Sequence, residues 1–295
     1  MDMNLVLNHV DLYYGKEQAL TNVSLQLHSP RVYALIGRNG SGKTTLLSLI
    51  ANYRKHSSGQ ITLNGEPLFE NSRQTRHVQF LFQRNFDEYY ESGEELLQTA
   101  EELIDTFDIE AARRIASRFG LDLSIPMKKQ STGRRSMFQA VRGLASRAPV
   151  TIFDEAYTGM DAPSREIFYE EILKEQENHP RLIIMSTHLI SEMEHLFDEV
   201  IMLDQGRVLL ADDYENVISK GMTITGESSL VEKFTAELHV VKTRQLGGTK
   251  SVVIFQQVDQ NFLQEAKELG LDVGRVTLQD IFTSMTKGGE LHEEQ

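Results

Sequence analysis

The residues whose types and spacing best fit a defined chemistry form one short glycine-rich segment. Its residues match the spacing G-x-x-x-x-G-K-[ST] and are Gly37, Arg38, Asn39, Gly40, Ser41, Gly42, Lys43, Thr44 and Thr45. Glycine adopts backbone dihedral angles that other residues avoid, so successive N–H groups can turn toward one anion. The ammonium group of Lys43 and the hydroxyl group of Thr44 suit a phosphate chain and its Mg²⁺ ion. The segment therefore predicts a nucleoside triphosphate site.

The residues on either side of this segment predict the elements that position it. An apolar run, Val32 to Ile36, precedes it and predicts a strand, and Leu46 to Ile50 follows with helical character. A helix beginning at about Lys43 would direct the positive end of its dipole at the bound anion. The alternative is an ordinary glycine-rich turn between a strand and a helix.

Two further apolar runs end in residues that can act on a phosphate. Val150 to Glu155 closes with Asp154 and Glu155, and Leu182 to His188 closes with a histidine. Buried parallel strands in α/β folds present ligand-binding residues at their carboxyl ends. Alternatively, the two acids could cap a helix and His188 could be an ordinary interior histidine.

The composition narrows the class of protein. The chain has 295 residues, no cysteine and a formal net charge of −13. The missing thiols exclude disulfides and thiolate chemistry, and the acidic balance disfavours a nucleic acid partner. No apolar run approaches the length of a bilayer span, and Met1 to Asn4 lacks the features of a signal peptide. We expect any association with a membrane to depend on a partner.

The remaining patterns predict a mixed α/β protein. Leu5 to Tyr14 and Ala19 to Leu27 alternate like antiparallel strands, and residues from about 87 to 145 are mostly helical. Strands and helices then alternate to about Val208, which predicts a parallel sheet. From Tyr214 a small α/β appendage follows, with strands at 238–243 and 251–256, a helix at 261–269 and a polar tail at 288–295.

The order of the motifs resembles that of the nucleotide-binding subunits of ABC transporters. The resemblance extends from about Leu5 to Leu210. Its motifs in chain order are Tyr14 as an adenine-stacking aromatic, Gly37–Thr45 as Walker A, Gln83 as the Q-loop glutamine, 130–134 as the signature, Asp154 and Glu155 as Walker B, 159–161 as the D-loop, and His188 as the switch histidine. Tyr14 alone could also be a strand-end aromatic.

The resemblance implies a fold and a set of roles. The fold is a P-loop NTPase (RecA-like) core with an antiparallel β-subdomain and an α-helical subdomain at about 87–145, forming an ATPase domain at 1–213 before an appendage at 214–295. Glu155 would be the general base, and His188 would hold the γ-phosphate. Mg²⁺ would be bound by Thr44, Gln83 and Asp154. ATP would be bound by Tyr14, Gly37, Arg38, Asn39, Gly40, Ser41, Gly42, Lys43, Thr44, Thr45, Gln83, Ser131, Gly133 and Asp161.

The signature segment departs from the family pattern. Gln130 stands where leucine is usual, Thr132 replaces a glycine, and Arg134 replaces a glutamine, whereas Ser131 and Gly133 are retained. In the family, this serine and glycine close over a nucleotide held by the opposite subunit. The alternative is that Ser131 only caps a helix.

The resemblance also implies partners. ATP would lie between two such chains, alike or unlike, and separate transmembrane permease subunits would dock near Gln83. The chain would then be peripheral to the cytoplasmic side of the cell membrane and hydrolyse ATP to power a transporter. The layout, with an appendage that ends in residues 276–282, resembles that of exporters with a separate permease chain. The sequence selects no cargo. The alternatives are a soluble ABC ATPase acting on ribosomes or DNA and a catalytically weak regulatory subunit.

Overall fold

The computed structural model describes residues 2–286 and divides the chain into two compact units. The first unit contains the described residues up to His188 together with His195–Ala211. The second contains Leu189–Glu194 and the described residues from Asp212 onward. The expected domain boundary lies between residues 213 and 214, so the start of the second unit is close to it. The expected polar tail at 288–295 lies outside the described residues.

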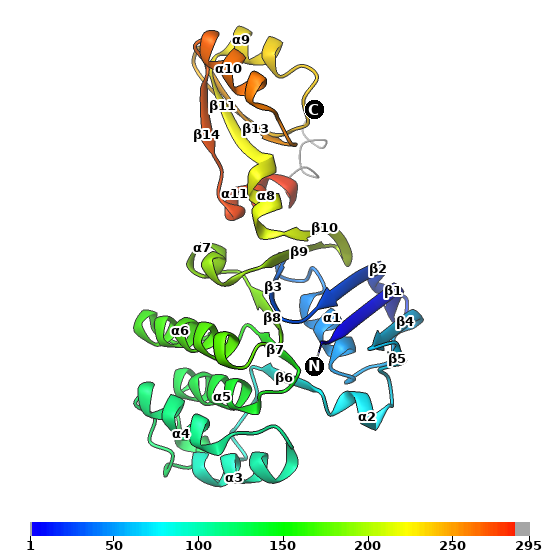
Figure 1. Ribbon diagram of the computed structural model, residues 1–295, viewed down its shortest axis with the longest axis vertical. Helices are drawn as coiled ribbons and strands as arrows, with labels where there is room; N and C mark the ends of the chain where they lie inside the picture. The colour runs from blue at the N-terminus through cyan, green and yellow to red at the C-terminus, as the bar shows by residue number, and fades with distance from the viewer. Residues whose placement is uncertain (1, 287–295) are drawn as a thin grey trace. The chain divides into compact units, whose positions relative to one another are not determined.

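The first unit is organised around a six-stranded sheet with the order β10-β9-β3-β8-β7-β6 (Figure 1). The pairs β3/β8, β3/β9, β6/β7 and β7/β8 are parallel, as the alternation of strands and helices predicted. Every residue of β7 and β8 is buried, which explains their continuous apolar character. The strands are β3 (Arg31–Ile36), β6 (Val78–Phe82), β7 (Val150–Asp154), β8 (Leu182–Thr187), β9 (Glu199–Asp204) and β10 (Arg207–Asp213).

A second sheet in the same unit is antiparallel and has the order β2-β1-β4-β5. Buried and exposed residues alternate along much of β1 and β2, so one face of this sheet is apolar. That face, the parallel sheet and α1 contribute to one hydrophobic core, which contains Leu7, Leu35 and Leu47. The elements are β1 (Asn4–Tyr14), β2 (Glu17–His28), β4 (Ser58–Leu63), β5 (Glu66–Pro67) and α1 (Lys43–Ile50).

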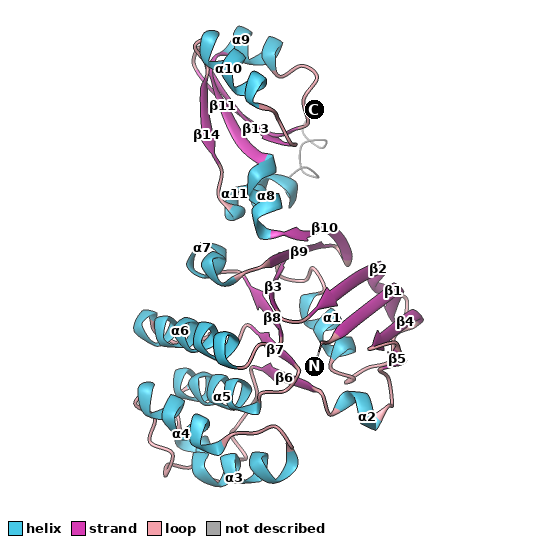
Figure 2. Ribbon diagram, viewed as in Figure 1, coloured by secondary structure: helices cyan, strands magenta, loops and turns pink. Residues whose placement is uncertain are grey.

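The helical section follows β6 (Figure 2), and its helices begin at side-chain caps. Ser92 and Glu95 form a capping box at the start of α3, and Asp108 accepts a hydrogen bond from the backbone of Ala111 at the start of α4. The segment expected to be mostly helical from about 87 to 145 contains several helices, and the first ends at Leu103 because Ile104 is extended. The section contains α3 (Gly93–Leu103), α4 (Ile109–Arg118) and α5 (Thr132–Ser146), whereas α2 (Ser72–Thr75) precedes β6 and α6 (Ala162–Asn178) follows β7.

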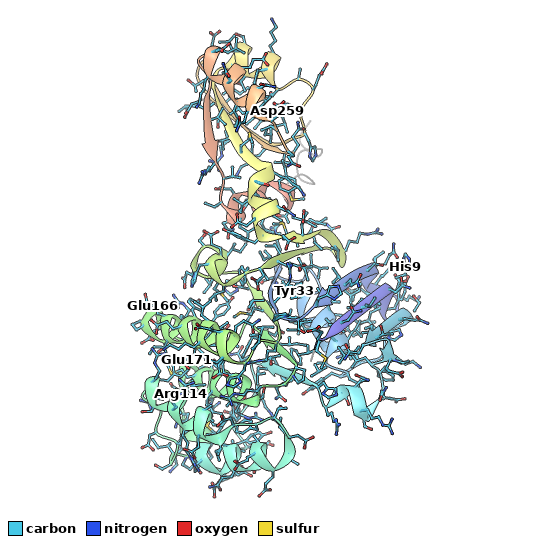
Figure 3. All side chains as sticks on the ribbon, in the orientation of Figure 1. His9, Tyr33, Arg114, Glu166, Glu171 and Asp259 are labelled. Carbon is cyan, nitrogen blue, oxygen red and sulfur yellow. The ribbon has the colours of Figure 1, made fainter. Side chains whose placement is uncertain are left out.

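Ion pairs join α4 to α6. Arg114 and Arg118 of α4 both bind the carboxylate of Glu171, with 2.8 Å between Arg114 Nη1 and Glu171 Oε2 (Figure 3). The Glu171 side chain is fully buried, and burial raises its pKa, but hydrogen bonds from Arg118 and Arg114 outweigh this and leave the pKa below its usual range. This pair of helices is therefore held by a charged contact.

The second unit contains the order β-α-β-β-α-β, with an antiparallel sheet arranged β12-β13-β11-β14. This is the ferredoxin-like topology. Residues of both helices, including Val231 and Ala266, pack with Ile224 and Ile254 of the sheet in one core. The elements are β11 (Gly221–Glu227), α9 (Ser228–Phe234), β12 (Val240–Leu246), β13 (Thr249–Phe255), α10 (Gln260–Glu268) and β14 (Asp272–Arg275).

The predicted strands and helix of the appendage correspond to β12, β13 and α10, whereas β11, α9 and β14 were not predicted. The unit also contains α7 (Ile190–Met193), α8 (Tyr214–Lys220) and α11 (Leu278–Thr286). The helix expected from Ile190 to Phe197 is a short α-helix followed by the 3₁₀ turn Glu194–Leu196. Across residues 2–286, no helix combines the length and the apolar character needed to cross a membrane.

Candidate functional site

The glycine-rich segment lies between β3 and α1, and its glycines are required for two different reasons. Gly40 and Gly42 have φ angles of +80° and +103°, which side chains with a Cβ atom rarely adopt. Gly37 does not have a positive φ in this range, so the expectation that it needs a special dihedral angle is wrong. A Cβ atom on Gly37 would instead lie 2.5 Å from the carbonyl oxygen of Leu203, so this glycine allows a close backbone approach.

The start of α1 offers several unused hydrogen-bond donors. Its first-turn N–H groups, from Lys43 to Thr45, lack acceptors within the helix by geometry, and the N-cap Gly42 has no side chain that could accept from them. The hydroxyl group of Ser41 is buried and has no hydrogen-bond partner among the described residues. Such a set of donors suits a bound anion.

Lys43 adds a positive charge to this set. Its side chain is buried and donates from Nζ to the carbonyl oxygen of Gly37 at 2.8 Å and to that of Arg38 at 3.2 Å. Burial lowers the pKa of Lys43, although the carboxylates of Glu155 and Asp154 act in the opposite direction. An anionic ligand beside the ammonium group would stabilise its charged form.

A cavity of about 660 Å³ opens beside this loop. It brings together the predicted Tyr14, the loop residues and Glu155, although Gly37, Arg38 and Ser41 do not line it. Four polar or turn residues that we did not predict also line it, namely Glu17, Gln18, Gln205 and Gly206. The lining from the glycine-rich segment consists of Asn39, Gly40, Gly42, Lys43, Thr44 and Thr45.

The turn between β9 and β10 contributes Gln205 and Gly206. Both have a positive φ, +45° and +74°, as in the two-residue turn that suits a β-hairpin. Gly206 donates its N–H to the carbonyl oxygen of Ser41 at 2.9 Å and accepts from the N–H of Thr21 at 2.9 Å. No local pattern in the sequence indicates these contacts with the loop and with β2.

Tyr14 ends β1 at the rim of the cavity. Its ring is 41% exposed, and the guanidinium carbon of Arg54 lies 5.0 Å from the ring centroid. Tyr13, the preceding residue, is 47% exposed and does not line the cavity. Successive side chains of a strand point to opposite faces, so Tyr14 alone of this pair is placed for stacking on a ligand.

The carboxyl ends of β7 and β8 hold the two acids through Ser186. Ser186 Oγ donates to Asp154 Oδ1 at 2.5 Å, and the N–H of Glu155 donates to Ser186 Oγ at 3.0 Å. Asp154 and Ser186 are paired across the two strands. Glu155 has a φ of +47°, which is uncommon for a residue other than glycine and is found most often at functional sites. We did not predict Ser186, because no motif marks it.

His188 lies beside Glu155, the other residue proposed for catalysis. Its Nδ1 atom is 3.4 Å from Glu155 Oε1 and 3.1 Å from the hydroxyl oxygen of Tyr157. The His188 side chain is 52% exposed and the Glu155 side chain 32% exposed, so both can be reached by a ligand.

Gln83 lies on a different cavity, of about 300 Å³. Glu155 also lines this second cavity, together with Thr132 and Ser136 of α5, whereas Gln83 does not line the first one. Glu155 is thus common to the two cavities. Asp154 lines neither of them, since its side chain is buried against Ser186.

The predicted signature and D-loop residues do not line the cavity beside the glycine-rich loop of their own chain, called the phosphate cavity below. Ser131 caps α5 by accepting a hydrogen bond from the N–H of Arg134 at 3.3 Å, and Asp161 caps α6 by accepting from the N–H of Ser164 at 3.0 Å. Ser131 and Asp161 are exposed, and Gly133 is half-buried. Within one chain, the helix-cap interpretation of Ser131 is therefore correct.

Comparison with known proteins places this geometry in a family. Residues 20–158 match the model of the ABC transporter family. The ATP-dependent lipid A-core flippase of Francisella novicida is 26% identical over 240 residues, which cover 77% of this chain and 40% of the flippase. The ABC transporter ATP-binding protein YtrB of Bacillus subtilis is 23% identical over 276 residues, which cover 92% of this chain and 94% of YtrB. The chain thus spans less than half of the flippase and nearly all of YtrB.

Solved structures show the same fold. An ATP-binding subunit of an ABC transporter has a TM-score of 0.65 and 23% identity, covering 72% of this chain and 91% of the subunit. The ATP-binding cassette MJ0796, solved as a dimer with ADP and Pi, has a TM-score of 0.62 and 18% identity, covering 71% of this chain and 98% of the cassette. The chain therefore contains an ABC transporter domain, matched over residues 20–158, and by its motifs and fold it is similar to the ATP-binding proteins of ABC transporters.

Proposed function

We propose that this chain binds ATP with Mg²⁺, hydrolyses it between two cassettes and thereby powers a membrane transporter of the export type. The observation that carries the proposal is the position of Glu155, which lines the phosphate cavity and lies 3.4 Å from His188. Phosphoryl transfer requires positioning and neutralisation of charge more than covalent catalysis. A carboxylate that reaches the phosphate cavity is suited to accept a proton from an attacking water.

The loop supplies the binding part of this activity. Lys43 and the N–H groups at the start of α1 neutralise phosphate oxygens, the buried hydroxyl of Ser41 gains a partner, and Tyr14 stacks on the adenine. Once ATP is bound, Glu155 orients and deprotonates the water, and His188 binds the γ-phosphate. These roles are supported by the shared cavity and by the 3.4 Å contact between the two side chains.

The three residues proposed for Mg²⁺ have suitable donor atoms. Thr44, Gln83 and Asp154 offer a hydroxyl, an amide and a carboxylate oxygen, the hard ligands that Mg²⁺ prefers. No group of three or more histidine, cysteine or acidic residues that could hold a metal occurs within the described part of the chain. This fits an ion that takes most of its ligands from water and phosphate. When bound, Mg²⁺ would neutralise charge on the phosphate oxygens.

A second cassette completes the proposed site. Ser131, Gly133 and Asp161 lie outside the phosphate cavity of their own chain, so we expect them to contact nucleotide from an opposite chain. A structurally similar cassette has been solved as a dimer, which supports this arrangement. We propose that the pair, alike or unlike, docks on separate permease chains near Gln83 at the cytoplasmic side of the membrane. The coverage of YtrB over nearly its whole length supports a cassette made as a separate chain.

Substitution of Glu155 tests the proposed hydrolysis. Glu155→Gln keeps the shape of the side chain but removes the base, so turnover should fall by about a hundredfold or more while ATP binding is retained. Glu166→Gln is the matched control, because Glu166 is an exposed acid on α6 that lines neither cavity. ATPase rate and ATP affinity should be measured on the full chain. Equal rates for wild type and Glu155→Gln would refute the role of Glu155.

A further inference from the structure

We propose that Tyr157 is a positioning residue for His188. By donating a hydrogen bond to Nδ1, Tyr157 holds the neutral imidazole with its proton on Nε2 and prevents Nδ1 from donating to Glu155. The inference rests on the proposed ATP hydrolysis for its functional meaning. Its structural part, the state of one imidazole ring, can be tested without any activity. Tyr157 follows Glu155 by two residues and was not singled out by any motif.

Tyr157 is buried at the end of β8. Its side chain is only 3% exposed, and its hydroxyl oxygen lies within hydrogen-bond distance of three atoms from two consecutive residues. The distances are 3.1 Å to Thr187 Oγ1, 3.0 Å to the backbone N of His188 and 3.1 Å to His188 Nδ1. The rings of Tyr157 and His188 are 5.6 Å apart between centroids and inclined by 58°. The phenol is thus fixed against the backbone that carries the histidine.

The hydrogen bonds around the phenol oxygen indicate whether Tyr157 or Nδ1 of His188 is the donor in their contact. The N–H of His188 can only donate, and the hydroxyl of Thr187 donates to the same phenol oxygen. A phenol oxygen accepts about two hydrogen bonds and donates one. These two donors point at the phenol oxygen, and its own proton is assigned to the ring nitrogen 3.1 Å away, Nδ1 of His188. A neutral imidazole that accepts at Nδ1 carries its proton on Nε2.

This arrangement separates the two proposed catalytic side chains. Glu155 Oε1 lies 3.4 Å from the same Nδ1 atom, and a hydrogen bond between them would require a proton on Nδ1. In that case, the imidazole would donate to the carboxylate that must accept a proton from water. By donating to Nδ1, Tyr157 leaves the Glu155 carboxylate available as a base and leaves Nε2–H available as a donor to a phosphate oxygen.

The first test is the protonation state of His188 in the wild-type chain. Long-range proton–nitrogen NMR of the full chain labelled with ¹⁵N distinguishes a protonated from an unprotonated imidazole nitrogen, and a His188→Gln spectrum identifies the signal. We expect an unprotonated Nδ1 that accepts a hydrogen bond, and a protonated Nε2. A protonated Nδ1 in the neutral ring would overturn the proposal, whatever the ATPase rate. This test needs no variant of Tyr157 that must fold.

The second test is Tyr157→Phe, which removes only the hydroxyl group. We expect the Nδ1–H form to become populated and kcat to fall roughly fivefold at unchanged KM, as for the loss of one hydrogen bond. Tyr169→Phe is the control for removal of a buried hydroxyl elsewhere and should change neither quantity. In a His188→Gln background, Tyr157→Phe should cause no further loss, whereas an additive loss would mean that Tyr157 acts only on stability.

The two tests separate failure of this inference from failure of the proposed function. A wild-type chain with the expected tautomer but no ATPase activity in any assembly would refute the hydrolysis and leave the positioning contact correct. An active wild-type chain whose rate and imidazole signal are both unaffected by Tyr157→Phe would refute the positioning role and leave the hydrolysis correct.

Discussion

A Cβ atom on Gly133 would lie 2.3 Å from the carbonyl oxygen of Gly159, so the turn at the start of α5 and the loop after Glu155 are in direct backbone contact. Gly159 itself has a φ of +84°, so neither partner can gain a side chain without strain. The contact joins two segments that the resemblance assigns to the opposite nucleotide. It also explains why glycine is required at position 133 within a single chain.

Gly133→Ala is expected to destabilise the first unit by about 2 kcal/mol, because the clash is with backbone rather than with a flexible side chain. Urea unfolding measures this change. Gly248→Ala is the control, since a Cβ atom on Gly248 would meet nothing within 4 Å; a change below about 0.5 kcal/mol is expected there. If the two variants were equally stable, the close approach would not constrain position 133.

Lys43→Met is expected to weaken ATP binding by at least about tenfold, because the ammonium group is lost from the phosphate cavity. The nucleotide-free variant should be no less stable than wild type at neutral pH. Burial lowers the pKa of Lys43, so the unfolded chain binds this proton more tightly than the folded one. The stability of wild type should therefore rise relative to Lys43→Met as the pH approaches the usual range of lysine.

Isothermal titration with ATP and thermal unfolding over a pH series measure both effects of Lys43→Met. Lys55→Met is the control, because Lys55 is exposed and does not line the cavity. It should leave ATP affinity unchanged. An unaltered affinity for Lys43→Met would remove the basis of the phosphate-binding interpretation.

Tyr14→Ala is expected to raise the Kd for ATP by about tenfold, the size of one lost stacking contact with a base. The neighbouring Tyr13→Ala is a close control, because Tyr13 is similarly exposed but lies outside the cavity. Fluorescence titration with ATP distinguishes the two. Equal effects of the two substitutions would favour the alternative that Tyr14 is only a strand-end aromatic.

Glu171→Gln is expected to destabilise the first unit by about 2 kcal/mol at pH 7, because it removes the buried carboxylate that pairs with both Arg114 and Arg118, although each arginine keeps one other acidic partner. The pKa of Glu171 is lowered in the folded chain, so its contribution is present above the ordinary value of 4.5 and is lost as the pH falls through the lowered value. The difference between wild type and variant should therefore shrink in acid.

Urea unfolding at neutral and acidic pH measures this difference. Glu170→Gln is the control, since Glu170 is the adjacent acid, is exposed and also pairs with Arg118. It should have a much smaller effect. A stability difference for Glu171→Gln that stayed constant with pH would show that the carboxylate charge is not what holds α4 to α6.

The parts of the site that could be predicted are those encoded by neighbours in sequence. The spacing of glycines before Lys43 predicts the loop, and the apolar run before Asp154 predicts a buried strand with acids at its end. Ser186, Tyr157 and Gly206 act through contacts with distant segments, which no local pattern records. Knowledge of the strand order was needed to place them.

The same limit applies to the fold. Apolar spacing predicts two helices between residues 94 and 119, but it does not give the end of α3, which stops at Leu103 because Ile104 is extended. In the second unit, β12 and β13 were predicted from the Gly247-Gly248 turn between them. Strand β11 pairs with β13 and β14, both far along the chain, so the ferredoxin-like order emerges only from pairing.

The hydrogen bonds made by Gly206 have a consequence for how the chain meets its ligand. One hairpin turn is tied by its N–H to Ser41 of the phosphate loop and by its carbonyl group to Thr21 of the antiparallel sheet. These hydrogen bonds connect the phosphate loop to the hairpin turn and to the antiparallel sheet. The loop is therefore preorganised, and little conformational entropy is lost when ATP binds. We expect the nucleotide to bind a loop that already has its bound conformation.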